Sequence, residues 1–374
     1  MSTPVSPPEQ TPMPTEYRSA IAATHRLLVV RLSAMGDIIH AMPAIVALRR
    51  AKPDLRIGWL VEERWAELLC ARNAERLAPP SERKPLADWV HVARFSRWRR
   101  ALLSRETWRE MQSCRREVRA RKYQVTLDLQ GAIRSALAAH SSDAAIRIGA
   151  AQPREGPARM FYTHAIDVRG THVIEHALSL ASELAGYALE YVQPPFPVDP
   201  ASEAWADHRS EMLSGRPLAI LNPGAGWGAK CWPPESFGAV ARALAKRGMA
   251  VLINHGPGEE ALAEAVRDTS GGVAVPLKCS VGELIALTRR ARLFIGGDTG
   301  PMQLAAALRV PVVALFGPTR PERNGPFGTP SVVLRSPQSV YNTTHTDRRD
   351  EGLIAIEPQA VIQAAQRLLG EQHG

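Results

Sequence analysis

The segment Arg31-Leu-Ser-Ala-Met-Gly-Asp-Ile-Ile-His40 decides the fold class, because it continues the apolar run Leu27–Leu32. The run predicts a buried first strand, and the residues from Ile38 onward predict a helix after a short turn. Open α/β sheets bind ligands at the carboxyl ends of their strands, so Asp37 is expected at a ligand site. The alternative is that Asp37 caps the helix by accepting hydrogen bonds from its free N–H groups. The turn holds one glycine, Gly36, and so lacks the three-glycine fingerprint of dinucleotide-binding proteins.

Strand-like runs alternate with helical patterns along the 374 residues, as in parallel sheets with crossover helices. Predicted strands are 26–32, 56–61, 124–129 and 145–148 in the first half, and 217–222, 249–254, 272–276, 292–296 and 310–315 in the second. Predicted helices in the first half are 38–51, 62–72, 104–121, 131–140 and 171–186. The pattern therefore predicts an α/β protein of two Rossmann-like, doubly wound domains that face a central cleft.

Proline-rich residues 191–200 mark the boundary between these domains. The predicted organisation is a disordered tail at 1–22, a first domain at 23–190, a linker at 191–215, a second domain at 216–355 and a C-terminal helix in 356–374. The tail has no apolar stretch typical of a signal peptide, and no apolar run reaches transmembrane length. Any membrane contact is therefore expected to be peripheral.

Basic residues crowd one stretch of the first domain, and the whole chain carries a formal net charge of +9. They are Arg94, Arg97, Arg99, Arg100, Arg105, Arg109, Arg115, Arg116, Arg119, Arg121 and Lys122. Such a stretch attracts nucleic acid, anionic lipid head groups or a phosphorylated substrate, or it is only a solvated helix face. No nucleic-acid-binding signature accompanies it. The four cysteines are too widely spaced for a zinc site or a disulfide framework, which favours reduced thiols in a cytoplasmic protein.

Three loops of the second half follow predicted strands and are expected at one edge of the sheet. In Asn222–Pro233, Gly224, Gly226 and Gly228 let main-chain N–H groups converge on an anion, and Lys230 adds a positive charge. The alternative is a structural turn with an incidental lysine.

The other two loops suit the remaining parts of a nucleotide diphosphate. Glu259 or Glu260 can accept hydrogen bonds from a ribose, although acids in a first helical turn also serve as partners of the helix dipole. In Ile295–Gln303, Asp298 is expected to cap a helix opened by Thr299 and Gly300, whose N-terminus suits a diphosphate. The long loop Phe316–Gly328 is expected to line the same pocket.

Six motifs together make the chain resemble the lipopolysaccharide heptosyltransferases, and among them the type I enzymes. They are Ser33-Ala-Met-Gly-Asp37 with His40, Trp59-Leu-Val-Glu-Glu63, Asp128-Leu-Gln-Gly131, Lys230-Cys-Trp-Pro233, Asp298-Thr-Gly300 and Gly317-Pro-Thr319. The resemblance implies a GT-B glycosyltransferase without metal or cofactor, with an acceptor domain first and an ADP-heptose domain second. It implies an inverting transfer of heptose to Kdo-lipid A at the cytoplasmic face of the inner membrane.

The resemblance also implies roles for individual residues. Asp37 is the expected general base, and Lys230 stabilises the departing diphosphate. The expected donor-binding residues are Gly224, Gly226, Gly228, Glu259, Asp298, Thr299, Gly300 and Gln303. The expected acceptor-binding residues are Gly36, His40, Arg97, Arg99, Arg100, Gln130 and Arg134.

The chain departs from the family pattern in three places. Gln303 stands where many relatives have histidine, Arg320 stands where an acid is frequent, and no hydroxyl residues precede Lys230 in its loop. Two other functions stay open at this stage. One is a type II-like enzyme with another acceptor or donor, and the other is a non-catalytic nucleotide-sugar-binding protein at the membrane.

Overall fold

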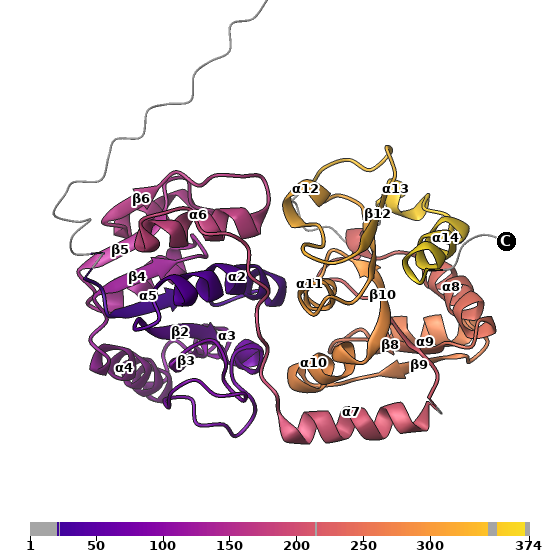
Figure 1. Cartoon of the computed structure of the whole chain (residues 1–374), viewed down its shortest axis with the longest axis horizontal. Helices are drawn as coiled ribbons and strands as arrows, with labels where there is room; N and C mark the ends of the chain where they lie inside the picture. Colours follow the sequence, from indigo (N-terminus) through magenta and orange to yellow (C-terminus); the bar gives the residue numbers. More distant parts are fainter. Residues whose placement is uncertain (1–20, 22, 214, 343–349, 371–374) are drawn as a thin grey trace, which may run out of the picture.

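The computed structural model describes residues 21, 23–213, 215–342 and 350–370, and these form two α/β domains that lie side by side (Figure 1). Most of the expected tail lies outside these residues, but the Ile21 side chain is buried in the core of the first domain. No helix within the described ranges is long and apolar enough to cross a membrane.

The first domain is built on a six-stranded parallel sheet with strand order β3-β2-β1-β4-β5-β6. Its strands are β1 (Arg26–Val30), β2 (Arg56–Glu62), β3 (Trp89–Ala93), β4 (Val125–Asp128), β5 (Ile146–Ala150) and β6 (His164–Ile166). Its helices are α2 (Met35–Ala51), α3 (Phe95–Trp98), α4 (Arg105–Ala120), α5 (Ile133–Ser141) and α6 (Val173–Ala185), with 3-10 turns η1 (Glu63–Leu68) and η2 (Gly156–Phe161).

The second domain repeats this strand order in its own six-stranded parallel sheet, β12-β11-β10-β7-β8-β9. Its strands are β7 (Leu218–Asn222), β8 (Ala250–Asn254), β9 (Ala274–Leu277), β10 (Ala291–Gly297), β11 (Val312–Phe316) and β12 (Ser331–Arg335). Its helices are α7 (Pro200–Met212), α8 (Pro234–Lys246), α9 (Glu260–Thr269), α10 (Val281–Arg289), α11 (Gly300–Ala307), α12 (Pro321–Asn324), α13 (Glu351–Ile354) and α14 (Pro358–Leu368), with the 3-10 turn η3 (Gly228–Lys230).

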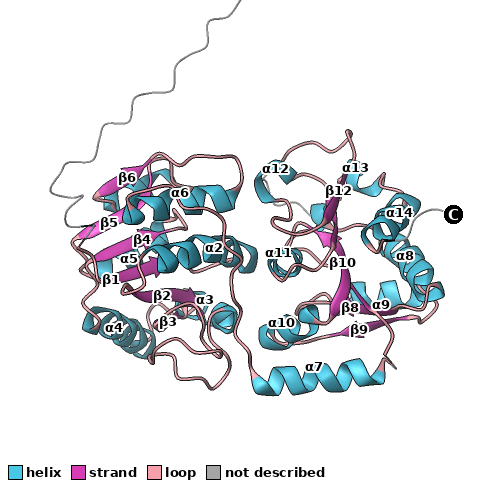
Figure 2. Ribbon diagram, in the orientation of Figure 1, coloured by secondary structure: helices cyan, strands magenta, loops and turns pink. Residues whose placement is uncertain are grey.

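Helices cover both faces of each sheet (Figure 2). Successive side chains of β1 point to opposite faces, so Leu27 and Val29 pack in one core cluster and Leu28 and Val30 in another. In the first domain α2 and α6 contribute to the first cluster, whereas α4 and α5 contribute to the second. Burial on both faces explains the nearly continuous apolar runs of the central strands.

The predicted two-domain Rossmann-like architecture is confirmed, whereas three details of the prediction are wrong. The edge strands β3, β6 and β12 were not predicted, because short edge strands carry no continuous apolar run. The segment 62–72 forms only the short turn η1, in which Ala66 and Leu68 are the buried residues. Helix α2 begins at Met35, three residues earlier than expected.

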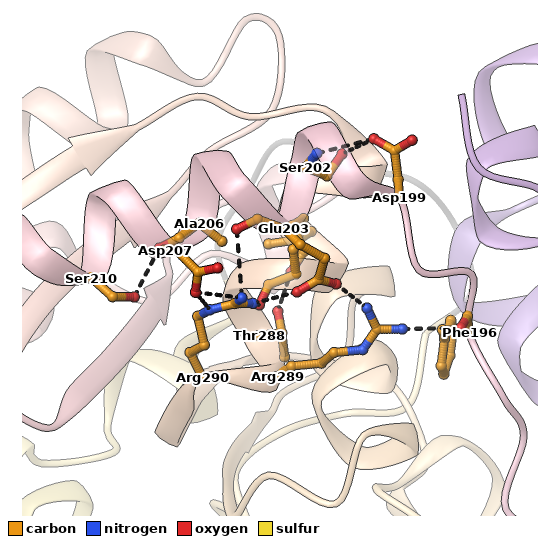
Figure 3. Close-up of polar contacts among 12 residues, drawn as sticks. Phe196, Asp199, Ser202, Glu203, Ala206, Asp207, Ser210, Thr288, Arg289 and Arg290 are labelled. Carbon is orange, nitrogen blue, oxygen red and sulfur yellow. Dashed lines mark hydrogen bonds and ion pairs between the residues drawn. The ribbon is translucent and has the colours of Figure 1, made fainter. Parts of the chain in front are cut away.

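The segment 191–215 contains α7, a helix of 13 residues that is clamped to α10 of the second domain (Figure 3). The Glu203 carboxylate forms ion pairs with both Arg289 and Arg290, and Arg290 also contacts Asp207 at 2.6 Å. Arg289 donates hydrogen bonds to two main-chain carbonyls just before α7, those of Phe196 and Pro197, both at 3.0 Å. The part of this segment from residue 196 onward is therefore fastened to the second domain, and the Val198 N–H also donates to the Glu82 carbonyl of the first domain at 2.9 Å.

Candidate active site

The turn after β1 places Asp37 in the first turn of α2, three residues beyond the N-cap residue Ala34. Its carboxylate accepts a hydrogen bond from the Ala34 N–H at 3.1 Å, which explains the early start of the helix. The same carboxylate forms an ion pair with Arg31 at 3.0 Å. Asp37 therefore does stabilise the helix start, although from a position inside the helix. Its side chain remains 38% exposed, so the capping contact leaves room for a substrate contact.

Charge governs the protonation of Asp37. Burial raises the pKa of this carboxyl, but the Arg31 guanidinium and the Ala34 N–H together lower it more strongly, with smaller contributions from His40 and Arg154. The pKa therefore ends below its usual value, and the carboxylate is ionised at neutral pH. A base in this state can accept a proton from a substrate hydroxyl without first losing one of its own.

The loop after β4 lies beside this turn, because β1 and β4 are neighbours in the sheet. Asp128 is 1% exposed and accepts hydrogen bonds from the N–H of Gln130 (2.8 Å), Ser135 Oγ (2.9 Å) and Tyr162 OH (2.8 Å). Burial raises the pKa of Asp128, and these hydrogen bonds oppose the rise. Through these hydrogen bonds, the buried Asp128 carboxylate holds the conformation of the loop after β4.

Two of the predicted acceptor residues hold the β1 and β4 loops together. Gln130 accepts a hydrogen bond from the Leu32 N–H at 2.8 Å, while its buried Nε2 has no partner in the described structure. Arg134 donates to Ser33 Oγ at 2.6 Å. Both contacts lie in the turn that carries Asp37.

In the second domain the three expected loops come together, because they follow the adjacent strands β10, β7 and β8. The buried amide of Asn254 donates to Asn222 Oδ1 at 2.5 Å, and Asn222 donates to the Gly224 carbonyl at 2.8 Å. A Cβ on Gly224 would overlap the carboxyl group of Glu259, so a larger residue here would displace that carboxyl group. Glu259 also accepts from the Gly256 N–H at 2.7 Å.

The other glycines of this group are less constrained. A Cβ on Gly226 would meet no atom within 4 Å, and Gly228 begins η3, where its carbonyl accepts from the Cys231 N–H at 3.0 Å. The loop is therefore held by a hydrogen bond at Gly224, whereas a side chain at Gly226 would point into free space.

Lys230 and Asp298 form an ion pair at 2.8 Å, with side chains only 14% and 11% exposed. Lys230 Nζ also contacts the Asp298 carbonyl at 3.2 Å and lies 5.6 Å from the centre of the Trp227 ring. The prediction that Asp298 caps α11 is wrong, because its side chain turns to Lys230 and Thr299 takes the N-cap position. The expected meeting of Lys230 with the α11 loop is nevertheless observed.

The N-termini of α2 and α11 meet at the contact between the two domains. A Cβ on Gly300 would lie 2.6 Å from Cβ of Met35, and a Cβ on Gly36 would lie 3.2 Å from Cγ of Gln303 and 3.6 Å from Cα of Gly300. Two glycines therefore allow one domain to approach the other next to Asp37, which lies in the first turn of α2, and Asp298, which lies two residues before α11. Gln303 is buried and donates to the Asn324 carbonyl at 2.6 Å.

His40 lies in this same domain contact. Its ring is 7% exposed, meets the His172 ring edge-on at 5.4 Å between centroids, and has no hydrogen-bond partner on either nitrogen among the described residues. Burial lowers the pKa of His40 to about 4 and His172 adds to the lowering, whereas the neighbouring Gln303 side chain and, more weakly, the carboxylates of Asp37 and Asp298 oppose it. The ring of His40 thus lies, as a neutral group, in the contact that Gly36 and Gly300 make possible between the two halves of the candidate site.

His172 connects the domains directly. Its Nδ1 accepts from the Ile174 N–H at 3.2 Å, so Nε2 carries the proton that is donated to the Gly325 carbonyl at 3.0 Å. Phe327 packs against His172 with centroids 4.9 Å apart.

We expect Gly300→Ala to weaken the domain contact, because the added methyl group would overlap Met35. Both kcat and KM should change, as when a conformational contact next to the chemistry is disturbed, and small-angle scattering should show a larger radius of gyration. Gly156→Ala, in the exposed start of η2, is the matched control, because its methyl group would meet nothing within 4 Å. Unchanged scattering and kinetics in Gly300→Ala would show that this contact does not set the domain arrangement.

The three arginines expected at the acceptor differ in their surroundings. Arg97 forms ion pairs with Glu106 at 2.8 Å and Glu110 at 3.0 Å. Arg99 and Arg100 are exposed, and no carboxylate of the described chain pairs with them. Only the latter two present unneutralised charge.

Sequence reasoning did not single out Arg31, Arg154 and His172 as site residues. Arg31 directly follows β1, and Arg154 follows the predicted strand 145–148, so a basic residue after a strand end was the available signal. The role of His172 depends on the domain contact, for which the local sequence carries no signal.

One cavity of about 440 Å³ lies at the rim of the domain contact, lined by Thr171 of the first domain and Arg320, Glu322, Arg323 and Tyr341 of the second. The Arg320 guanidinium stacks on the Tyr341 ring at 4.8 Å. Arg320, Glu322 and Arg323 belong to the loop 316–328, but no residue of the three glycine-bearing loops lines this cavity, so the expected common pocket stays a prediction. Within the described ranges, no three His, Cys, Asp or Glu side chains are grouped as metal ligands.

Two Rossmann-like domains whose switch-point loops meet across a domain contact define the GT-B class of glycosyltransferase. The glycosyltransferase family 9 (heptosyltransferase) profile matches residues 111–353. Lipopolysaccharide heptosyltransferase 1 of Pseudomonas aeruginosa is 31% identical over 346 residues, which cover 87% of this chain and 90% of the relative. The chain therefore belongs to glycosyltransferase family 9, the heptosyltransferase family, as the motifs predicted.

Solved structures agree with this assignment. The Escherichia coli heptosyltransferase WaaC with ADP is 25% identical, with a TM-score of 0.73 over 92% of this chain and 99% of that chain. The same enzyme with ADP-2-deoxy-2-fluoro heptose is also 25% identical, with a TM-score of 0.69 over 90% of this chain and 98% of that chain.

Proposed function

We propose that this protein is an inverting, metal-independent heptosyltransferase of type I. It transfers L-glycero-D-manno-heptose from ADP-heptose to a Kdo residue of Kdo-lipid A during inner-core lipopolysaccharide synthesis. The names of the relatives and the ADP and heptose analogue bound to WaaC support the donor and the pathway. The observation that carries the proposal is the position of two charged groups at the contact between α2 and α11. Asp37 lies on the first-domain side of this contact, and the Lys230–Asp298 ion pair lies on the second-domain side.

The chemistry follows from this arrangement. An acceptor hydroxyl attacks the anomeric carbon of heptose, and Asp37 accepts the hydroxyl proton. The bond from the anomeric carbon to the ADP oxygen breaks, and negative charge develops on the diphosphate. In this proposal Lys230 and the free N–H groups at the start of α11 stabilise that charge, although Pro301 supplies no N–H. A single displacement of this kind inverts the anomeric centre.

The diphosphate of the donor must compete with Asp298 for the Lys230 ammonium group, since Lys230 and Asp298 already form an ion pair. We expect the diphosphate to draw the ammonium group toward itself, while Asp298 becomes available to sugar hydroxyls. Gly224, Gly226 and Gly228 supply main-chain N–H groups to the phosphates, Glu259 accepts from the ribose, and Thr299, Gly300 and Gln303 complete the donor side. On the acceptor side, Gly36, His40, Gln130 and Arg134 shape the pocket, and the arginines near α3 contact the anionic acceptor at the cytoplasmic face of the inner membrane.

The experiment that tests this function offers ADP-heptose with either Kdo-lipid A or an acceptor that already carries one heptose. Transfer to the first acceptor alone, unaffected by a chelator, supports the proposal. Transfer only to the heptosylated acceptor would indicate the type II-like alternative, and ADP-heptose binding without turnover would indicate a non-catalytic binding protein.

The arginines near α3 give a separate prediction about the acceptor. Replacing Arg97, Arg99 and Arg100 with Ser should raise the KM for the anionic acceptor and leave the KM for ADP-heptose nearly unchanged. In the parent enzyme the acceptor KM should rise with added salt, because exposed charges are screened beyond roughly 8–10 Å at physiological ionic strength. Arg97→Ser alone should have the smallest effect, since two glutamates already neutralise this side chain. A parental acceptor KM in the triple variant would reduce this group to a solvated surface.

A further inference from the structure

An apolar tip projects from the first domain between α3 and α4. Leu103 is 100% exposed, and Leu102 is 54% exposed. Trp108, one turn into α4, is 53% exposed. Three large apolar side chains exposed within seven residues form a surface that water solvates poorly.

The tip is held rigidly at both ends. On its α3 side the Trp98 ring is buried, and its Nε1 donates to Glu110 at 2.8 Å. On its α4 side Ser104 caps the helix by accepting from the Glu106 N–H at 3.2 Å. The two leucines are therefore presented to solvent by an ordered turn.

Positive charge surrounds the tip without compensation. The acids of α4 are already engaged, because Glu106 and Glu110 form ion pairs with Arg97 and the Glu117 carboxylate is hydrogen-bonded to the His91 ring. No carboxylate in the described part of the chain pairs with the exposed arginines of α4, Arg105, Arg109, Arg115 and Arg116. The surface therefore carries a net positive charge around an apolar centre.

Helix geometry places this charge on one side. Thr107, Met111, Cys114 and Val118 face the core, and their spacing defines the inner face of α4. Arg105, Arg109 and Arg116 fall on the opposite face, with Trp108 at its border. In Figure 1 α4 lies on the side of the first domain away from the second domain.

The topology sets the position of the tip relative to the active site. The tip follows the carboxyl end of β3, and Asp37 follows the carboxyl end of β1 in the same parallel sheet. Both therefore lie toward the same edge of the sheet. A surface that contacts the tip therefore lies at the sheet edge that carries Asp37.

We propose that the tip Leu102–Leu103, with Trp108 and the unpaired arginines around it, docks the protein on an anionic lipid bilayer. The leucines enter the boundary between head groups and acyl chains, the indole lies at that boundary, and the arginines bind lipid phosphates. This assignment rests on the proposed function only for its biological setting, since it brings the enzyme to a lipid-anchored acceptor.

The test is co-sedimentation of the full chain with vesicles of phosphatidylcholine alone, or of three parts phosphatidylcholine to one part phosphatidylglycerol. The parent should partition strongly only to the anionic vesicles. Leu102→Ser with Leu103→Ser should lower this partitioning by about tenfold or more. Arg105→Ser with Arg109→Ser should lower it by about fivefold for each arginine removed, and the loss should shrink in high salt.

Matched controls separate a specific surface from a general effect of composition. Met212→Ser removes an apolar side chain that is 61% exposed on α7, and Lys246→Ser removes an exposed charge on α8. Both should partition like the parent. Equal partitioning of the leucine variant and the parent, equal partitioning of the parent to both vesicle types, or tighter binding of the parent to duplex DNA than to anionic vesicles would each overturn the proposal.

A second assay keeps this inference distinct from the proposed function. With a deacylated acceptor that dissolves without a membrane, the leucine variant should transfer heptose at the parental rate. With the acylated acceptor in anionic vesicles it should be slower. A parent that binds anionic vesicles but transfers no heptose to either acceptor would refute the function and leave the docking surface standing.

Discussion

Asp37→Asn should lower kcat by about 10²–10⁴, the usual contribution of a positioned acid or base. The amide oxygen of the substituted side chain can still accept from the Ala34 N–H, so the start of α2 should survive while the base is lost. ADP affinity should stay at the parental value, because the donor loops belong to the other domain. Steady-state kinetics together with calorimetric titration of ADP would measure both effects.

The pH profile of the parent gives a second readout on Asp37. Its pKa is lowered in the folded protein, so the base stays ionised until the pH falls below about 3.9, the ordinary value for aspartate. The acidic limb of kcat/KM should therefore lie below that value, provided that the protein remains folded. Nearly full turnover in Asp37→Asn would leave Asp37 as a helix-stabilising residue and would remove the base from the mechanism.

Lys230→Ala should lower kcat by about 10²–10³, comparable to the loss of one donor to a developing negative charge. ADP binding should also weaken, because the loop loses its positive charge. Since Asp298 is 11% exposed, the single variant leaves a largely buried carboxylate without its partner. The double variant Lys230→Ala with Asp298→Asn removes that penalty, so its thermal stability should exceed that of the single variant.

A second lysine, Lys278, tests whether ADP binding depends on the position of Lys230 or only on a positive charge in this domain. Lys278 lies in the same domain, is 58% exposed and pairs with Glu260 at 2.9 Å. Lys278→Ala should leave ADP affinity and kcat within about twofold of the parent, as expected for an exposed pair. If Lys230→Ala binds ADP as tightly as Lys278→Ala does, Lys230 does not contact the diphosphate.

The central architecture could be predicted from the sequence because parallel strands buried on both faces leave long apolar runs. Runs such as 26–32 and 217–222 correspond to β1 and β7, the strands next to the switch point of each sheet. Edge strands lack this signal. All three residues of β6 are half-buried, and β12 mixes half-buried and exposed residues without a buried one. Neither segment therefore shows the run of buried apolar residues that predicts a strand.

The same reasoning explains which parts of the site could be anticipated. Strand-end loops on neighbouring strands must meet, so the contacts of Lys230 with Asp298 and of Asn222 with Asn254 follow from strand order. The environment of His40 does not, because it depends on how two separate domains pack together. The exact helix starts also escaped prediction, since an acid at the third helical position and an acid at the cap leave similar sequence patterns.

The ion pairs of Glu203 with Arg289 and Arg290 have a practical consequence for exchanging acceptor specificity between relatives. A chimera that joins two proteins at residue 215 would combine α7 of one parent with α10 of the other and would separate these charges. A junction before Phe196 transfers α7 together with the helix to which it is bound. A chimera made from this protein should therefore keep α7 and α10 from the same parent.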